Sequence, residues 1–449
     1  MNVNVIGSGL DSLITSFLLL EKGHEVTLYS GGNKLAGHFA GLKNEHTIFD
    51  AGMVLLEKED RGETQEEIIT YNNEFGYKSR KFLLQTFLEI QRILGECEPA
   101  IVKTLLSNKI EVEDYFISDN LNAFNYLDGS DRVTLIGNLE NILEGKNPKF
   151  THPKFKWNTD CIRKNSVSFN LELMYGEKIY RQYFGKFLYA LTGSSDVSMP
   201  MRFHRKVWIP LYYPESLLSH IKKSNFDLPS VQFFKFKRSS IALAIKELIL
   251  KIDRDKRFKL INTPVAELNK EAFRSKESIY FLPIDDLSRL FPHSSVHDFA
   301  SQMSQLCITQ NTNQIRFLHL CVSKLESKTV FLQDPVEGLF RYSINNSPDN
   351  NLSIACFEFG SGAPNSMDEM VKISNNFLRP SKILCAGQVN STNYAQKFST
   401  MGMGEWESRV SEVCEYIKSP SSTVNITHPD ALSFNDNVVR GLAAASRIE

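Results

Sequence analysis

The chain has 449 residues and a nearly balanced charge, with 51 lysines and arginines against 52 aspartates and glutamates. This balance gives no electrostatic reason to expect a nucleic acid or an anionic membrane as partner, and it favours a small-molecule substrate. The length predicts two or three domains with room for large hydrophobic cores.

Cysteine usage and hydropathy narrow the class of protein further. The seven cysteines are scattered, and none stand in a C-x-x-C spacing, which predicts neither a disulfide framework nor a zinc site. The first strand is not preceded by a signal-peptide pattern, and no apolar run approaches the length of a membrane span. We therefore expect a cytoplasmic protein without a metal site or a membrane span. The sequence does not predict the oligomeric state.

The first thirty residues predict a βαβ unit. An apolar strand leads into Gly7-Ser8-Gly9, an apolar pattern of helical period follows, and a second apolar strand ends the unit. In such a unit Gly7 forms the tight turn, and Gly9 lets backbone amides at the helix N-terminus approach a diphosphate. Ser12 replaces the third glycine of the usual pattern and is small enough for helix and strand to pack closely. The stretch therefore predicts a dinucleotide-binding site.

Ser30 ends the second strand, where dinucleotide-binding proteins usually carry Asp or Glu. That carboxylate accepts hydrogen bonds from the hydroxyls of the adenosine ribose, whereas a serine makes one such bond without the charge. A βαβ unit that folds without binding a nucleotide stays open as the alternative.

Two further motifs follow in order, Ala36-Gly37 and Phe49-Asp50-Ala51-Gly52. Together with the G-x-G turn they resemble the flavin amine oxidases and the related protoporphyrinogen oxidases and UDP-galactopyranose mutases. The resemblance implies an α/β fold, in which a discontinuous Rossmann-like FAD-binding domain is interleaved with a substrate domain of mixed sheet and helices. It implies FAD as the cofactor, and Gly37, Asp50 and Gly52 as cofactor-binding residues beside Gly7, Gly9, Ser12 and Ser30.

The middle of the chain predicts helices. Amphipathic patterns at 81–95 and 133–144 indicate an inserted helical lobe. The aromatic segment 172–193 resembles one that the protoporphyrinogen oxidases and mutases carry, and Tyr180 and Tyr189 become candidate substrate-binding residues. Aromatic residues at helical spacing more often form a core, so that alternative stays open.

Alternating segments from residue 314 to residue 343 predict the sheet of the substrate domain. Arg341 stands in this region, and its planar fork of donors suits a phosphate or a carboxylate. We therefore take Arg341 as a candidate substrate-binding residue, with a solvent-facing strand arginine as the alternative.

Near the C-terminus, an apolar strand ends at Gly387, and Gly402 and Gly404 precede another helical pattern. In the relatives, a Gly-Asp or Gly-Arg pair ends this strand, and the following helix points its N-terminus at the flavin pyrimidine ring. A helix dipole there stabilises the negative charge of reduced flavin. The resemblance thus implies that Gly387, Gly402 and Gly404 bind the cofactor, with Gln388 in place of the charged partner.

These predictions divide the chain into three parts. They are an FAD-binding domain of residues 1–60, 230–285 and 375–418, a substrate and helical domain of residues 61–229 and 286–374, and a C-terminal tail of residues 419–449.

The resemblance implies an FAD-dependent oxidoreductase in which a hydride leaves a carbon of a small molecule for the flavin. A mutase-like enzyme acting on a nucleotide sugar and a non-catalytic scaffold with lost or weakened FAD binding stay open. The scaffold is favoured by departures from the family pattern, which are Ser30, Ala190 in place of a lysine, Arg238-Ser239 in place of a glycine turn, and Gln388. The spacing of residues assigns no catalytic side chain.

Overall fold

The computed structural model describes residues 1–31, 35–43, 48–50, 52, 54–58, 80–107, 109–113, 127–144, 166–196, 218, 221–222, 232–237, 240–263, 267, 277–282, 297–298, 301–302, 307–346, 351–378, 382–399, 422–426 and 434–448. Within 385–399 it describes the strand but not the side chains.

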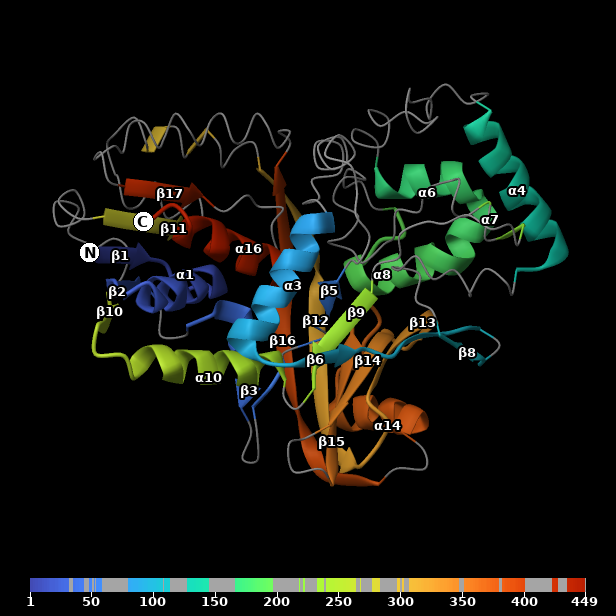
Figure 1. The fold of residues 1–449 in the computed structure, drawn as a ribbon. Coiled ribbons are helices and arrows are strands. Elements are labelled where there is room, and N and C mark those ends of the chain that lie inside the picture. Colours follow the sequence, from blue (N-terminus) through green and yellow to red (C-terminus); the bar gives the residue numbers. More distant parts are fainter. Residues whose placement is uncertain are drawn as a thin grey trace.

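Five parallel strands form the first sheet (Figure 1). β1 (Asn2–Ile6) is central, between β2 (Glu25–Ser30) and β11 (Glu277–Leu282). β10 (Phe258–Asn262) and β17 (Ser422–Ile426) are the edge strands. α1 (Leu10–Glu21) connects β1 to β2, so the predicted βαβ unit and the Rossmann-like α/β fold are confirmed.

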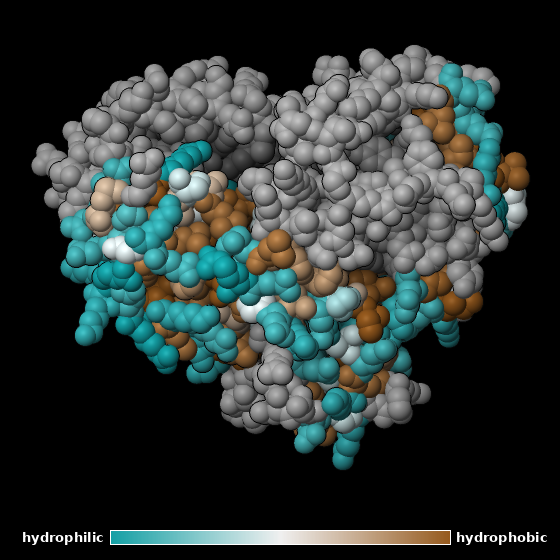
Figure 2. All heavy atoms as spheres, viewed as in Figure 1, coloured by the Kyte–Doolittle hydropathy of each residue, from teal (hydrophilic) through white to brown (hydrophobic). Residues whose placement is uncertain are grey.

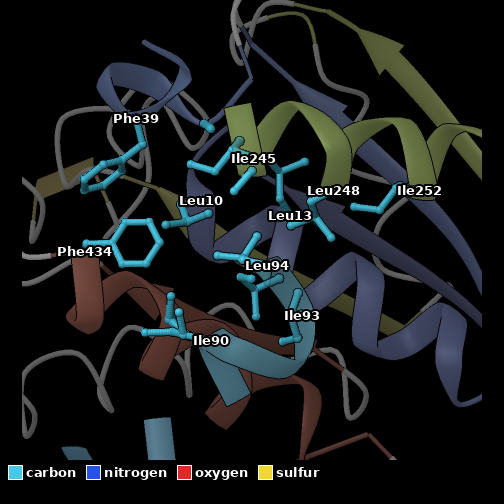
Figure 3. Packing of buried hydrophobic residues seen from close by; sticks show 14 of the residues in the cluster. Leu10, Leu13, Phe39, Ile90, Ile93, Leu94, Ile245, Leu248, Ile252 and Phe434 are labelled. Atoms are coloured by element: carbon cyan, nitrogen blue, oxygen red, sulfur yellow. The ribbon is translucent and has the colours of Figure 1, made fainter. Parts of the chain in front are cut away.

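Four helices pack with this sheet around one hydrophobic cluster. They are α1, α3 (Arg80–Leu94), α10 (Ile241–Asp253) and α16 (Phe434–Ala445). Figure 3 shows Leu13 of α1 beside Leu248 of α10, and Ile90 of α3 beside α16. The helix predicted at 81–95 therefore belongs to the first domain, and its assignment to the helical lobe was wrong.

The C-terminal residues complete this first domain. β17 pairs with β11, and α16 packs along α1. Thr15 Oγ1 donates a hydrogen bond of 3.1 Å to the Gly441 carbonyl, and Lys22 Nζ donates to the carbonyls of Ala445 (2.8 Å) and Ile448 (2.6 Å). The prediction of an appended tail at 419–449 is therefore wrong, because this segment supplies an edge strand and a core helix.

The second sheet has seven strands. In order they are β16 (Ile383–Ser399), β12 (Cys307–Ser323), β15 (Leu352–Phe359), β14 (Leu339–Asn346), β13 (Lys328–Val336), β7 (Val102–Leu105) and β8 (Glu111–Val112). All neighbouring pairs are antiparallel except β13 and β7. β16 places residues 383–399 in this sheet, so their assignment to the FAD-binding domain was wrong.

The two faces of the second sheet differ in polarity. One face is apolar and packs on α14 (Met367–Leu378). Its buried residues include Leu318, Tyr342 and Phe357, which lie opposite one another on neighbouring strands. Because side chains alternate along a strand, the residues between these face the other way.

The helical lobe and two small sheets complete the described fold. The lobe contains α4 (Gly129–Leu143), α6 (Val167–Tyr175), α7 (Glu177–Ile179), a π-helical segment (Tyr180–Gly185) and α8 (Lys186–Thr192). The small sheets are β3 (Leu42–Lys43) with β4 (Ile48–Phe49), and β5 (Leu56–Lys58) with β9 (Gln232–Phe236) and β6 (Cys97–Pro99). A 3₁₀ helix spans Gly37–Ala40.

Hydrophilic and hydrophobic residues are interspersed over the part of the first domain that Figure 2 shows in colour. Within the described ranges, no helix has both the length and the apolar character needed to cross a membrane.

Candidate functional site

The turn after β1 has a geometry that requires glycine. Gly7 has φ +138°, and its amide donates a hydrogen bond of 2.9 Å to the Tyr29 carbonyl. A Cβ on Gly7 would lie 2.5 Å from the Phe281 carbonyl oxygen and 2.8 Å from Ser12 Oγ. The turn therefore presses against β2, β11 and the first turn of α1, as the glycine pattern predicts.

α1 begins at this turn, directly after Gly9. Gly9 is the N-cap residue and, having no side chain, leaves the first amides without a hydrogen bond from a capping side chain. Ser12 is fully buried one turn into the helix, and its Oγ has no hydrogen-bond partner within the described part of the chain. The helix N-terminus carries a positive partial charge, so this end of α1 suits a phosphate.

Two other residues predicted to contact the cofactor, Ser30 and Gly37, differ in their exposure. Ser30 is fully buried at the end of β2, and its carbonyl accepts a hydrogen bond of 3.0 Å from the Thr263 amide. Its side chain is thus not exposed toward a ribose. Gly37 is exposed with φ +55°, and the preceding residue, Ala36, donates its amide to the Ser8 carbonyl at 2.7 Å. The Ala36-Gly37 segment therefore folds back onto the glycine turn.

Asp50 caps α10. Its carboxylate accepts hydrogen bonds from the amides of Ile241 (3.2 Å) and Ala242 (2.8 Å). Burial raises the pKa of Asp50 to about 6, against the opposing effect of these two hydrogen bonds. The Asp50 carboxylate thus binds the N-terminus of α10.

The residues around Asp50 also join the two sheets. The Asp50 carbonyl lies 3.2 Å from Nε2 of His319 on β12. A Cβ on Gly52 would lie 2.9 Å from the Phe317 ring, also on β12. The F-D-x-G motif therefore brings the first domain against the second sheet.

That side of the second sheet is its polar face. Two rows of residues that oppose one another across the strands define it. One row is Phe317, Glu358, Arg341, Phe331 and Thr104, and the next is His319, Cys356, Ser343, Thr329 and Val102. Polar side chains are thus buried where the sheet meets the first domain.

Arg341 lies on this polar face and is already paired. Its Nε and Nη2 contact the two carboxylate oxygens of Glu358 at 3.0 Å and 2.5 Å, and both residues are buried. The guanidinium carbon lies 5.3 Å from the centroid of the Phe331 ring and 5.6 Å from that of Phe340. The alternative of a solvent-facing arginine is therefore wrong, and a substrate anion would compete with Glu358 for this cation.

The two candidate tyrosines lie in different surroundings. Tyr180 is 6% exposed in the core of the helical lobe, and its hydroxyl contacts Ser168 Oγ (2.8 Å) and the Ser195 carbonyl. Tyr189 is 52% exposed. Of the three candidate substrate-binding residues, Arg341 alone belongs to the polar face, which α8 approaches through Phe187.

A small cavity opens on the same face. Its volume is about 20 Å³, and its lining includes Ile101, Lys235, Thr329 and Ser343. The Oγ of Ser343 and the Oγ1 of Thr104 are buried without a hydrogen-bond partner among the described residues. These hydroxyls were not predicted, although polar residues alternate with Tyr342 and Ile344 along β14 and indicate a polar strand face.

The C-terminal glycines do not take the predicted places. Gly387 lies inside β16 and not at the end of a strand of the parallel sheet, so that prediction of its position is wrong. Gln388 is opposite His319 in the register of β12 and β16. Gly402, Gly404, Arg238 and Ser239 lie outside the described residues. The strand at the edge of the parallel sheet is instead β17, and the helix that follows it is α16. The small residues within 441–445 could have indicated that this helix packs closely on another one.

We compared the chain with protein families and with known proteins. No family model matches the chain. A 4,4'-diapophytoene desaturase of Staphylococcus aureus is 23% identical over 185 residues, which are 40% of this chain and 29% of the desaturase. The match thus spans less than a third of that relative.

The whole chain matches solved structures. A crystal structure of reduced UDP-galactopyranose mutase superposes with a TM-score of 0.65 at 12% identity, over 100% of this chain and 93% of the mutase. The chain therefore shares the fold of this mutase. A fatty acid isomerase from P. acnes that produces conjugated linoleic acid shares it, with a TM-score of 0.53 at 11% identity over 99% of this chain and 98% of the isomerase. At these identities the likeness is one of fold.

The residues of this chain fit the diphosphate part of FAD. Glycine at position 7 lets the turn pack closely against β11, Gly9 adds no side chain at the start of α1, and the buried Ser12 hydroxyl has no partner among the described residues. At the end of β2, where the ribose carboxylate is expected, Ser30 is neutral and buried. Across the described ranges, no three His, Cys, Asp or Glu side chains cluster as a metal site would need.

Proposed function

We propose that this chain is an FAD-dependent oxidoreductase acting on a small molecule. The observation that carries the proposal is the turn from Gly7 to Gly9. This turn follows the carboxyl end of the central strand of a parallel sheet, and α1 begins directly after it. Dinucleotides bind at this place in open α/β sheets. The fold shared with flavoenzymes supports FAD as that dinucleotide.

The polar face of the second sheet supports the substrate side of the proposal. It meets the first domain at Asp50 and Gly52, and its buried Ser343 lines the small cavity on that face. Bound flavin supplies the hydride acceptor, and the protein positions the substrate and excludes water. In this scheme the Arg341–Glu358 pair orders the face as a neutral unit.

The sugar-nucleotide alternative has less support in the geometry. A nucleotide diphosphate needs cationic side chains that are available to it, whereas Glu358 already engages Arg341 through both carboxylate oxygens. The scaffold alternative rests on the departures from the family pattern, of which Ser30 is one, and is decided by the experiment that follows.

The experiment is the visible absorption spectrum of the purified protein, followed by heat release of any chromophore and its identification. We expect an oxidised-flavin spectrum with FAD released. Gly9→Val tests the site. Gly9 has φ −72°, which any residue adopts, and a Cβ there would clash with Asp11 Oδ1, so the Asp11 side chain must move to admit it. Circular dichroism verifies that the variant folds.

Gly137→Val is the matched control, because a Cβ at Gly137 in α4 meets no atom within 4 Å. We expect the Gly9 variant to fold without flavin and the Gly137 variant to keep it. Equal flavin content in the two variants, or a wild-type protein that takes up no FAD, refutes the proposal.

A further inference from the structure

A buried ion pair joins α1 to α16 beside the glycine turn. Nη2 of Arg440 contacts Oδ2 of Asp11, and the side chains are 15% and 5% exposed. The guanidinium carbon also lies 5.9 Å from the centroid of the Phe281 ring. The Phe281 carbonyl borders Gly7, so Arg440 is near two residues that border the turn.

Asp11 uses the donors that a phosphate would use. Its Oδ1 accepts a hydrogen bond of 2.9 Å from the Ser12 amide in the first turn of α1, and this oxygen is the atom nearest to a Cβ built on Gly9. Burial raises the pKa of Asp11, while the charge of Arg440 and the hydrogen bonds lower it. A carboxylate held by a helix N-terminal amide and an arginine fork imitates the environment of a bound phosphate.

We propose that Arg440 binds the diphosphate of the dinucleotide, and that Asp11 holds the guanidinium beside the turn and competes with the diphosphate for it. This inference rests on the proposed function. It also accounts for Ser30, because a site without a ribose carboxylate recognises the dinucleotide mainly through its diphosphate. A diphosphate beside Asp11 places several negative charges together, and Arg440 is the described cation that contacts this carboxylate.

The variants must separate binding from folding. Arg440→Gln alone leaves a buried carboxylate without its cation, which destabilises proteins strongly. The comparison is therefore made between Asp11→Asn and the double variant Asp11→Asn, Arg440→Gln. The asparagine keeps the acceptor for the Ser12 amide, and circular dichroism verifies the fold of both. Arg447→Gln, at an exposed position just past the end of α16, is the matched control.

The measurement is the dissociation constant of FAD, from quenching of flavin fluorescence at low and high salt. We expect Asp11→Asn to bind FAD at least as tightly as wild type, because a competing negative charge is gone. The double variant should bind at least about tenfold more weakly than Asp11→Asn, with a shallower salt dependence, since a charge-assisted bond is lost. Arg447→Gln should match wild type.

Each outcome has a distinct meaning. Equal affinity of Asp11→Asn and the double variant shows that the ion pair only holds the helices together and overturns this inference, while the proposed function stands. Failure of wild type and every variant to bind FAD overturns both.

Discussion

The close contact between α1 and α16 lets us predict how much Gly441→Ala changes the free energy of unfolding. A Cβ there would lie 2.8 Å from the Asp11 carbonyl oxygen and 2.8 Å from Ile14 Cβ. Carbon atoms in contact are about 3.5 Å apart or more, so Gly441→Ala must push the helices apart by about 0.7 Å. That movement breaks the 3.1 Å hydrogen bond from Thr15 to the Gly441 carbonyl.

Gly441→Ala has destabilising and stabilising effects on the free energy of unfolding. Overpacking costs about 1–3 kcal/mol, and the lost hydrogen bond costs about 1 kcal/mol. Replacing glycine by alanine within a helix gains about 1 kcal/mol. We therefore expect Gly441→Ala to lower the free energy of unfolding by about 1–3 kcal/mol.

Urea unfolding followed by circular dichroism measures this change, and Gly137→Ala provides the control. Gly137 lies within α4, and a Cβ there meets nothing within 4 Å. The same substitution should therefore stabilise the protein by up to about 1 kcal/mol at Gly137. If Gly441→Ala is as stabilising as Gly137→Ala, the described packing of α16 on α1 is refuted.

Three other predictions concern stability. Arg341→Leu should cost about 3–5 kcal/mol because it removes the cation that pairs with the buried Glu358 carboxylate, and a second change, Glu358→Leu, should restore most of that loss in urea unfolding. Phe434→Ala should cost about 3–5 kcal/mol in the same assay, because this ring is 3% exposed and packs edge-on at 5.3 Å from Phe39. Because burial raises the pKa of Asp50 to about 6, the folded protein keeps this proton to a higher pH than the unfolded chain. The free energy of unfolding should thus fall by up to about 3 kcal/mol from pH 4 to pH 7, and Asp50→Asn should remove that part of the pH dependence.

Each of these has an outcome that contradicts it. A double variant at 341 and 358 no more stable than Arg341→Leu would show that the ion pair is not the cause of the loss. A Phe434 variant as stable as wild type would mean that α16 does not bury this ring. An unchanged pH profile in the Asp50 variant would mean that this carboxyl titrates normally in the folded protein.

The N-terminal unit was predictable because its determinants are local. Gly7 and Gly9 are needed by the dihedral angle and the close contacts of one turn, and the apolar periods on either side define the strand and the helix. The position of α3 was not predictable in this way. An amphipathic helix shows that one side is buried but not against which domain, so residues 81–95 were assigned to the wrong lobe.

Contacts between distant segments limited the prediction of the site. The residue type of Arg341 indicated an anion partner, but that partner is Glu358, which the register of β14 and β15 brings opposite it. Arg440 reaches Asp11 across 429 positions in sequence, and neither local period nor spacing connects them. The polarity of the second sheet was detectable along β14, whereas its burial depends on how both domains meet.

Binding of FAD to the apoprotein tests the central claim most directly. Isothermal titration with FAD, and separately with FMN, compares two flavins that share the ring system but differ in the diphosphate and adenosine. Because the glycine turn and the N-terminus of α1 would hold the diphosphate, we predict that FAD binds at one site per chain and that FMN binds at least about tenfold more weakly. Absence of FAD binding, or equal affinity for the two flavins, would contradict a dinucleotide site at Gly7 to Ser12.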